Sequence, residues 1–210
     1  NCLLCLSDTK KEFRYNGKSG NFAASTIPIN HNYRFRTGSI TKPFTAAIIL
    51  QLMEEKALPL NSSYVDLVNI HTNTRIKKLL LSDEVELTDS ITIKVRVMHK
   101  SCLKDCISDD ERFFEYINEF PEQSWNWKLV IEKYFDYGLN RNADFRPGEG
   151  FHYSDTNYLL LAVLIEEICR SPFHEVLEKR KLNPLGLNET HLEFHQKKKG
   201  TLPIVFPFNS

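Results

Sequence analysis

The sequence lacks an excess of charge of either sign, and this absence excludes one class of function. Its 210 residues contain 27 Lys and Arg and 27 Asp and Glu, so the formal net charge is zero. Proteins that bind nucleic acid neutralise phosphates with a basic patch or a basic excess. The basic runs, at residues 10–11, 77–78 and 197–199, are short and typical of solvated faces. We therefore expect no nucleic-acid partner.

Long apolar runs are absent as well. The longest, at residues 158–165, is far shorter than the roughly 18 residues that a membrane span requires, so we expect no membrane span within this chain. The first residue is Asn1 rather than Met, which indicates a processed or excised piece. Internal repeats and low-complexity tracts are also missing from the sequence.

The five cysteines form an odd, scattered set and do not describe a disulfide framework. Cys2 and Cys5 have the spacing of half a zinc site, but no second pair at ligand spacing completes it. His191 and His195 lie four residues apart, in a segment whose alternation is typical of an exposed strand. We expect small buried thiols, no metal site and no organic cofactor.

The chain has a short β start and a mainly helical body. Apolar runs at residues 3–6, 12–15 and 34–36, separated by turn residues such as Asn16 and Gly17, predict two hairpin strands and a loop that leads into a helix. Apolar residues recur every three or four positions over residues 40–53, which predicts that helix. Further elements are expected as helices at 110–120, 125–137, 157–170 and 173–182, and as a strand at 202–206. Because the segment 157–170 is apolar on almost every side, it is expected in the middle of a helical bundle.

Ser39 and Lys42 are the first candidates for chemistry. The spacing Ser-x-x-Lys occurs three times in the chain, but only here does it stand where a strand-like segment and Gly38 give way to a long apolar helix. Residues i and i+3 face the same side of a helix, so the amine can reach the hydroxyl. A lysine can activate a serine if burial lowers its pKa. The alternative is that Ser39 is only a helix N-cap and Lys42 a solvated residue.

Tyr153 is the second candidate, because it stands at the entry of the apolar helix. A tyrosine near a lysine can shuttle a proton if the cation lowers the pKa of its phenol. The alternative is a core tyrosine at a helix entry, with Ser154 or Asp155 as the cap.

Four segments, in order, carry a resemblance to a known family. The segment FRTGSITKPFTA (residues 35–46) resembles the nucleophile motif of serine β-lactamase-like proteins, which include penicillin-binding D-alanyl-D-alanine carboxypeptidases, class C β-lactamases and related esterases. The segment FRPGEGFHYSDTNY (residues 145–158) resembles the tyrosine motif of that family. HKSCLKD (residues 99–105) is similar to its His-Thr-Ser-Gly-Leu segment, and NPLGLNET (residues 183–190) to its Pro-Leu-Gly-Met segment. The chain is identified as a member on these four matches.

The resemblance implies an α+β, β-lactamase/transpeptidase-like fold, in which N-terminal strands of an antiparallel sheet pack against a mainly helical region. It implies Ser39 as the acylated nucleophile, Lys42 as its activating partner and Tyr153 as the group that passes protons. Asp155 stands where many members have Asn and implies a substrate-binding role; unlike Asn, a carboxylate cannot donate a hydrogen bond. Residues 1–210 are expected to form a single partial domain, with strands at 1–38, a mainly helical region at 39–200 and a truncated end at 201–210.

The sequence departs from the family pattern at three points. Cys102 stands where Gly is usual, which is expected to alter a backbone shape that glycine allows, and Lys100 replaces a usual Thr. The third motif, Lys-Thr-Gly or His-x-Gly on a late sheet strand, has no counterpart. We therefore expect a truncated member without the C-terminal sheet strands. Loss of one oxyanion donor costs on the order of 10² to 10³ in rate.

Two functions follow from the resemblance. The first is a serine hydrolase that acts through a Ser39 acyl-enzyme on a peptidoglycan-type D-Ala peptide, a β-lactam or a small ester. The second is a catalytically silent β-lactamase-like domain that binds peptide or cell-wall ligands. A small-molecule or peptide substrate is the partner expected in the first case, and the family resemblance alone favours an extracytoplasmic location, in the periplasm or cell envelope. An unrelated helical interaction domain is the remaining alternative.

Overall fold

The computed structural model describes residues 2–21, 26–67, 78–83, 85–120, 123, 125–193, 195–196 and 204–205. The chain forms two compact units, and the mixture of strands and helices confirms the predicted α+β class. The strand unit comprises Asn1–Thr41 and Gly186–Ser210, and the helical unit comprises Lys42–Leu185. Each unit is described by itself below.

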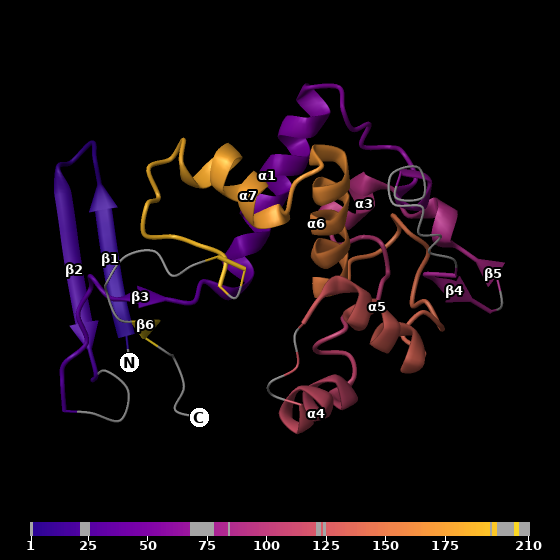
Figure 1. Cartoon of the computed structure of the whole chain (residues 1–210), viewed down its shortest axis with the longest axis horizontal. Coiled ribbons are helices and arrows are strands. Elements are labelled where there is room, and N and C mark those ends of the chain that lie inside the picture. Colours follow the sequence, from indigo (N-terminus) through magenta and orange to yellow (C-terminus); the bar gives the residue numbers. More distant parts are fainter. Residues whose placement is uncertain are drawn as a thin grey trace. The chain divides into compact units, whose positions relative to one another are not determined.

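The strand unit begins with an antiparallel hairpin of β1 (Cys2–Asp8) and β2 (Phe13–Ser19), seen side by side in Figure 1. The predicted turn at Asn16 and Gly17 is wrong, since both residues lie inside β2. The chain instead reverses directly after Asp8, whose carboxylate accepts hydrogen bonds from the backbone N–H groups of Lys10 and Lys11. An aspartate that satisfies the donors of a turn in this way stabilises the reversal.

The hairpin leaves apolar side chains and thiols exposed. Alternation along the paired strands places four large apolar residues on one face, and each is 45–52% exposed: Leu4, Leu6, Phe13 and Tyr15. Cys2 and Cys5 are exposed, so the expectation of buried thiols is wrong for this pair. It is confirmed for Cys102 and Cys106, which are buried in the helical unit, and Cys169 is partly buried.

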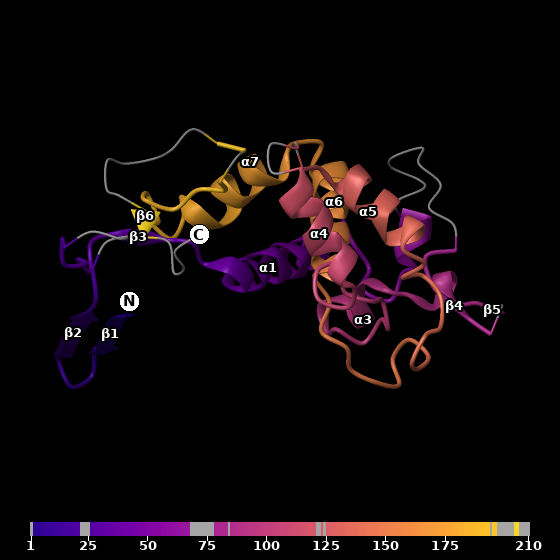
Figure 2. The ribbon, with the colours of Figure 1, turned by 90° about the horizontal axis from the view of Figure 1, so that it is seen from below.

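The strand unit also contains a short parallel pair, which Figures 1 and 2 show as adjacent arrows. β3 (Arg34–Phe35) pairs with β6 (Ile204–Val205), although antiparallel pairing was expected. The strand expected at 202–206 is confirmed over residues 204–205, and its other three residues lie outside the described ones. The 3-10 helix η1 (Gly38–Ile40) follows β3 and continues directly into α1 (Thr41–Glu54), where the sequence predicts a helix.

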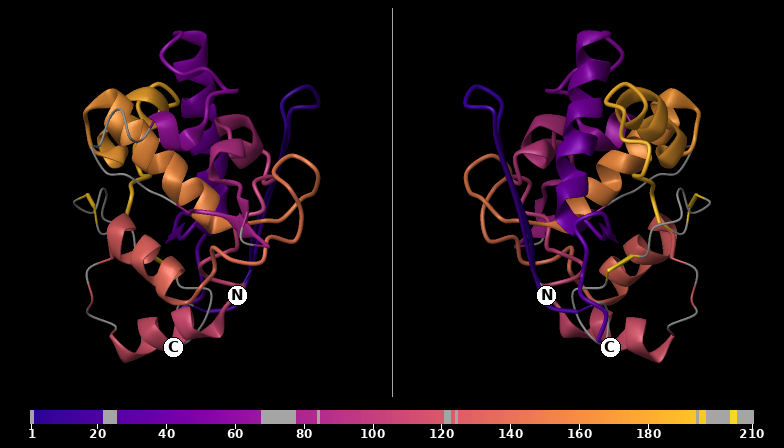
Figure 3. Two further views of the ribbon diagram at one scale, coloured as in Figure 1. Left: turned by 90° about the vertical axis from the view of Figure 1, so that its right-hand side faces the viewer. Right: turned by 90° about the vertical axis from the view of Figure 1, so that its left-hand side faces the viewer.

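The helical unit contains the other predicted helices at nearly the predicted positions: α4 (Glu111–Glu119), α5 (Trp127–Asp136), α6 (Asp155–Cys169) and α7 (Phe173–Leu177), which continues into the π-helical turn η3 (Glu178–Leu182). α7 lies beside α1 in Figures 1 and 3. Arg180, in η3, donates a 2.6 Å hydrogen bond to Glu55, directly after α1. Among its described residues, the unit also contains the small elements α3 (Ile93–Val97), η2 (Thr88–Ser90), β4 (Leu81–Ser82) and β5 (Val85–Glu86).

Helix α6 forms the centre of the helical unit and packs against α3, α5 and α7. Its fully or almost fully buried apolar side chains are Leu160, Leu161, Val163, Leu164 and Ile165. This arrangement confirms the prediction that an all-round apolar helix occupies the middle of a bundle. Among the described residues, we find no helix with the length and apolar character of a membrane span.

Candidate active site

Ser39 lies in the strand unit, inside η1, and is exposed. Gly38 before it has a φ of +53°, in the left-handed region that glycine adopts at little cost. The N-cap position of η1 belongs to Thr37, so Ser39 is not the N-cap of this turn. The backbone N–H of Thr41 bonds to the carbonyls of Gly38 and Ser39, which joins the turn to the start of α1.

Lys42 and Asp155 bring the first turns of α1 and α6 together within the helical unit. The Lys42 Nζ and the Asp155 Oδ1 form an ion pair, with the Lys42 side chain only 12% exposed. The carboxylate also stands at the N-terminus of α6, where the positive end of the helix dipole favours a negative charge. The alternative of a solvated Lys42 is therefore wrong.

Tyr153 completes this cluster. The Lys42 Nζ lies 4.7 Å from the centroid of the Tyr153 ring and hydrogen-bonds to its side chain. Tyr153 remains 42% exposed, so solvent and small molecules can reach it. The structure thus brings together three of the four residues that the sequence singled out. Ser39, the fourth, lies three residues before Lys42 along the chain, in the other unit.

The charge of Lys42 differs from the sequence-based expectation. Burial lowers the pKa of its amine, but the hydrogen bonds to Asp155 and Tyr153 outweigh burial and raise the pKa above its usual value. Lys42 is therefore an ammonium ion at neutral pH. Burial alone would move the pKa of Lys42 in the direction that the sequence led us to expect, and the hydrogen bonds to Asp155 and Tyr153 reverse that shift.

The entry of α6 is tied to the loop that contains Lys104. Ser154, which is fully buried, and Thr156 both donate side-chain hydrogen bonds to the Lys104 carbonyl, at 3.1 and 2.9 Å. Ser154 stands at the N-cap position, but its side chain caps no N–H of the helix. These bonds fix the backbone on both sides of Asp155 and immediately after Tyr153.

The segment 99–105 keeps a left-handed turn without the usual glycine. Cys102 has a φ of +63°, a conformation that is rare for residues with a Cβ atom. Its buried Sγ accepts hydrogen bonds from the backbone N–H groups of Asp144, at 3.1 Å, and Phe145, at 3.3 Å. Burial raises the pKa of the Cys102 thiol, so it stays neutral. The side chain at position 102 thus anchors the loop before the tyrosine segment.

His99 is the residue that the reasoning from sequence missed. Its ring stacks on Tyr153 with 4.6 Å between centroids, and its Nδ1 accepts a hydrogen bond from the Ser154 N–H. The signal was present, because residue 99 opens one of the four matching segments, but it was not treated as a site residue.

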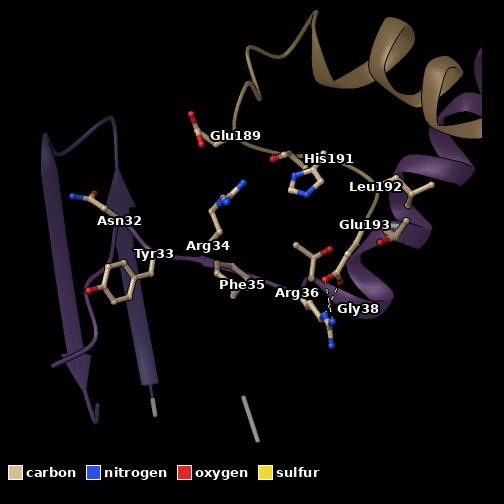
Figure 4. A pocket seen from close by; sticks show the side chains of 13 residues that line it. Asn32, Tyr33, Arg34, Phe35, Arg36, Gly38, Glu189, His191, Leu192 and Glu193 are labelled. Atoms are coloured by element: carbon tan, nitrogen blue, oxygen red, sulfur yellow. Dashed lines mark hydrogen bonds and ion pairs between the residues drawn. The ribbon is translucent and has the colours of Figure 1, made fainter. Parts of the chain in front are cut away.

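A cavity of about 760 Å³ lies in the strand unit (Figure 4). Its walls are residues 32–38, Thr41 and 189–193. Arg36 forms two hydrogen bonds with Glu193, at 2.6 and 2.9 Å, and Arg34 extends from β3 toward the same segment. The segment around His191 is irregular, so the expected strand alternation is wrong there. In the part of the chain that is described, no cluster of three or more His, Cys, Asp or Glu side chains is arranged to hold a metal ion.

Comparison with known proteins places these residues in a family context. The model of the Beta-lactamase family matches residues 4–202. Penicillin-binding protein 4* of Bacillus subtilis is 28% identical over 168 residues, which cover 79% of this chain and 32% of that protein. The chain therefore spans about a third of the length of this curated relative.

Several solved structures have a fold similar to that of this chain. A D-stereospecific amidohydrolase from Streptomyces matches with a TM-score of 0.67 at 23% identity, covering 88% of this chain and 52% of that one. A D-amino acid amidase from Ochrobactrum anthropi matches with a TM-score of 0.67 at 20% identity, covering 89% and 49%. The octameric penicillin-binding protein homologue from Pyrococcus abyssi matches with a TM-score of 0.62 at 25% identity, covering 85% and 37%.

Proposed function

Because the chain belongs to the β-lactamase family, whose model matches residues 4–202, we propose that it is a serine hydrolase that forms an acyl-enzyme on Ser39. One observation carries the proposal. Lys42 and Tyr153, which are distant in the sequence, meet at a partly exposed position, and Asp155 holds the lysine there. A purely structural role would not require an ammonium ion, an exposed phenol and a serine three residues before the lysine in the sequence.

The charge of Lys42 defines its role in the proposed reaction. An ammonium ion has no lone pair to accept the Ser39 proton. Tyr153 then accepts the proton in its phenolate form and becomes a neutral phenol. Lys42 stabilises the negative charge that the phenolate carries before the transfer. The Ser39 oxygen bonds to the substrate carbonyl carbon, and Tyr153 returns the proton to the leaving group. Water then repeats the sequence and releases the acyl group.

The proposed substrates are acyl compounds: a peptidoglycan-type D-Ala peptide, a β-lactam or a small ester. The names of the similar proteins, which include a penicillin-binding protein and a D-amino acid amidase, support an amide or lactam rather than a sugar or phosphate ester. The Asp155 carboxylate accepts hydrogen bonds only, which favours a substrate that presents an N–H group to it. A location outside the cytoplasm is part of the same proposal.

A second candidate, a silent domain that binds peptide or cell-wall ligands, is favoured by a specific observation. Lys100 and Cys102 stand where the resemblance implies Thr and Gly. Such a domain would keep the Lys42 cluster as a binding feature and would form no covalent adduct.

Covalent labelling tests the proposal. The protein is incubated with a fluorescent penicillin or a fluorophosphonate, and the expected result is one label on the wild type and none on Ser39→Ala. Ser7→Ala is the matched control, because Ser7 is an exposed serine with the same spacing to a lysine, Lys10. Labelling that persists in Ser39→Ala contradicts the proposal, and an unlabelled wild type favours the silent domain.

A further inference from the structure

We infer that His99 is a positioning residue, which holds the Tyr153 ring against the Lys42 ammonium. Its effect on turnover rests on the proposed function, whereas its effect on the Tyr153 ring does not. His99 lies just beyond α3; its ring stacks on Tyr153 and its Nδ1 accepts a hydrogen bond from the Ser154 N–H, so it acts through the tyrosine.

The first argument is a stack of three rings in the helical unit. Tyr158, on α6, is anchored by its hydroxyl, which donates a 3.0 Å hydrogen bond to the Val97 carbonyl. The His99 ring lies 5.0 Å from the Tyr158 ring and 4.6 Å from the Tyr153 ring, and the latter pair is nearly parallel at 21°. His99 thus connects a fixed aromatic ring to the more exposed one. Tyr153, at 42% exposure, depends on that contact to remain in one orientation.

The second argument is the hydrogen bonding of the imidazole and its backbone. The Ser154 N–H donates to the His99 Nδ1 at 3.1 Å, which requires an unprotonated Nδ1 and places the ring proton on Nε2. The His99 carbonyl accepts a 2.9 Å hydrogen bond from the His152 N–H. His99 is therefore bound to the residues on both sides of Tyr153.

The backbone of His99 is itself unusual. Its φ of +54° lies in the left-handed region, which costs free energy for a residue with a Cβ atom. The hydrogen bond from the His99 N–H to the Arg96 carbonyl, at 3.0 Å, holds this conformation directly after α3. The strained backbone turns the imidazole toward Tyr153, a placement that a regular continuation of the helix would not produce.

The groups around the imidazole keep it neutral. Burial lowers the pKa of His99 most, and the nearby charge of Lys42, on α1, lowers it further. Asp155, on α6, and Asp105 raise it, and His152 has the smallest, lowering effect. A proton on Nδ1 would remove the acceptor of the Ser154 N–H and add a positive charge near Lys42. The hydrogen bond between the Ser154 N–H and the His99 Nδ1 is therefore lost when the pH falls below the usual pKa of histidine.

Two variants separate the parts of this role. His99→Asn keeps an oxygen acceptor near the Ser154 N–H and tolerates a left-handed backbone, but it has no ring to stack. His99→Phe keeps the ring but loses the acceptor. His31→Asn is the matched control, since His31 is an exposed histidine of the strand unit.

The first measurement needs no activity: NMR of the wild type and the three variants with ¹⁵N-labelled histidine and ¹³C-labelled tyrosine. We expect a neutral His99 with its proton on Nε2, which titrates below the usual pH range of histidine. The Tyr153 ring signals should shift in His99→Asn, shift less in His99→Phe and stay unchanged in His31→Asn. A His99 proton on Nδ1, or Tyr153 ring signals that are unchanged in both variants at position 99, would overturn the inference.

The second measurement is the acylation rate against pH with the fluorophosphonate. Misplacement of a reacting group by about 1 Å costs up to about 100-fold in rate, so His99→Asn should lose about 10- to 100-fold with little change in the half-saturating concentration. His99→Phe should recover part of that loss, and both should lack the acid-side fall that the wild type shows. Wild-type rates and pH profiles in both variants would contradict the inference. If the wild type itself is not acylated, the proposed function fails, and the NMR result alone decides the role of His99.

Discussion

Two tyrosine rings in the helical unit each lie against a basic side chain, and the two pairs differ in solvent exposure. The Arg96 guanidinium carbon lies 3.7 Å from the centroid of the Tyr64 ring, and the Lys42 Nζ lies 4.7 Å from that of Tyr153. Arg96 and Tyr64 are fully buried, whereas Tyr153 is 42% exposed. The same combination of residue types thus occurs both in the core and at a reachable position.

Hydrogen-bonding partners separate the two pairs. No side-chain nitrogen of Arg96 has a hydrogen-bond partner within the described part of the chain, and burial lowers its pKa to about 10. Lys42 has the carboxylate of Asp155 and the hydroxyl of Tyr153, which raise its pKa. The buried Tyr64 hydroxyl donates a hydrogen bond to the Leu160 carbonyl. The comparison teaches that solvent access and partners, rather than residue types, mark the candidate site.

The sharpest way to break this comparison is to remove each cation. Lys42→Met should lower acylation by the fluorophosphonate by more than about 10³-fold, because it removes the charge that stabilises the proton acceptor. Arg96→Met should leave the rate per folded molecule within about threefold, because the Arg96 side chain lies against Tyr64 and the substitution keeps the backbone carbonyl that accepts the His99 N–H. The rates are measured by stopping the labelling reaction at a series of times and quantifying the labelled protein. Equal losses in both variants, or a normal rate in Lys42→Met, would remove the distinction.

The two hydroxyls should differ in the same way. Tyr153→Phe is expected to reduce turnover by about 10²- to 10⁴-fold with the fold retained, the usual contribution of a general acid-base group. Tyr64→Phe removes only the bond to Leu160 and should cost about 1 kcal/mol of unfolding free energy. Steady-state rates and urea unfolding measure the two quantities. Unchanged turnover in Tyr153→Phe would make it a structural tyrosine.

Stability should respond mainly at the buried pair. Arg96→Ala is expected to lower the unfolding free energy by about 2 to 5 kcal/mol, because it leaves a cavity beside the Tyr64 ring. Arg96→Met should cost clearly less, since it fills the space and removes a buried charge without hydrogen bonds. Urea unfolding of both variants provides the measurement. If Met costs as much as Ala, hydrogen bonds rather than volume hold Arg96.

Alkaline pH gives a smaller, signed effect at Lys42. Because its pKa is raised in the folded state, its contribution to stability is complete below its usual pKa of 10.5 and is lost as the pH rises through the higher folded value. Asp155→Asn removes a main cause of the raised pKa, so its stability should fall less steeply above pH 10.5 than that of the wild type. Urea unfolding from pH 8 to 12 checks this, and parallel curves would contradict the assignment.

The sequence predicted the helices well because their signals are local. The apolar repeat that leads to α1 and the all-round apolar α6 need no knowledge of distant residues. The strands expected at 3–6 and 12–15 overlap β1 and β2, but β2 continues through Asn16 and Gly17, because pairing with β1 outweighs their local turn signal. The parallel pairing of β3 with β6 joins segments far apart in the chain, and periodicity carries no information about it.

Within the candidate site, residue identity was predictable and charge was not. The motif resemblance singled out Lys42, Tyr153 and Asp155, and the structure brings them together. The raised pKa of Lys42 depends on the balance between burial and two hydrogen bonds from α6 and the residues before it. The stacking of His99 on Tyr153 depends on a left-handed backbone that no residue pattern indicates. Both are consequences of three-dimensional packing.

The central claim is that Ser39, three residues before Lys42 in the sequence, carries an acyl group during turnover. Intact-mass measurement during reaction with a penicillin or an activated ester, followed by peptide mapping, tests it most directly. The account predicts one acyl adduct on the peptide that contains Ser39, which appears and then decays as water releases it. No adduct at any time, or an adduct on another residue, would contradict it.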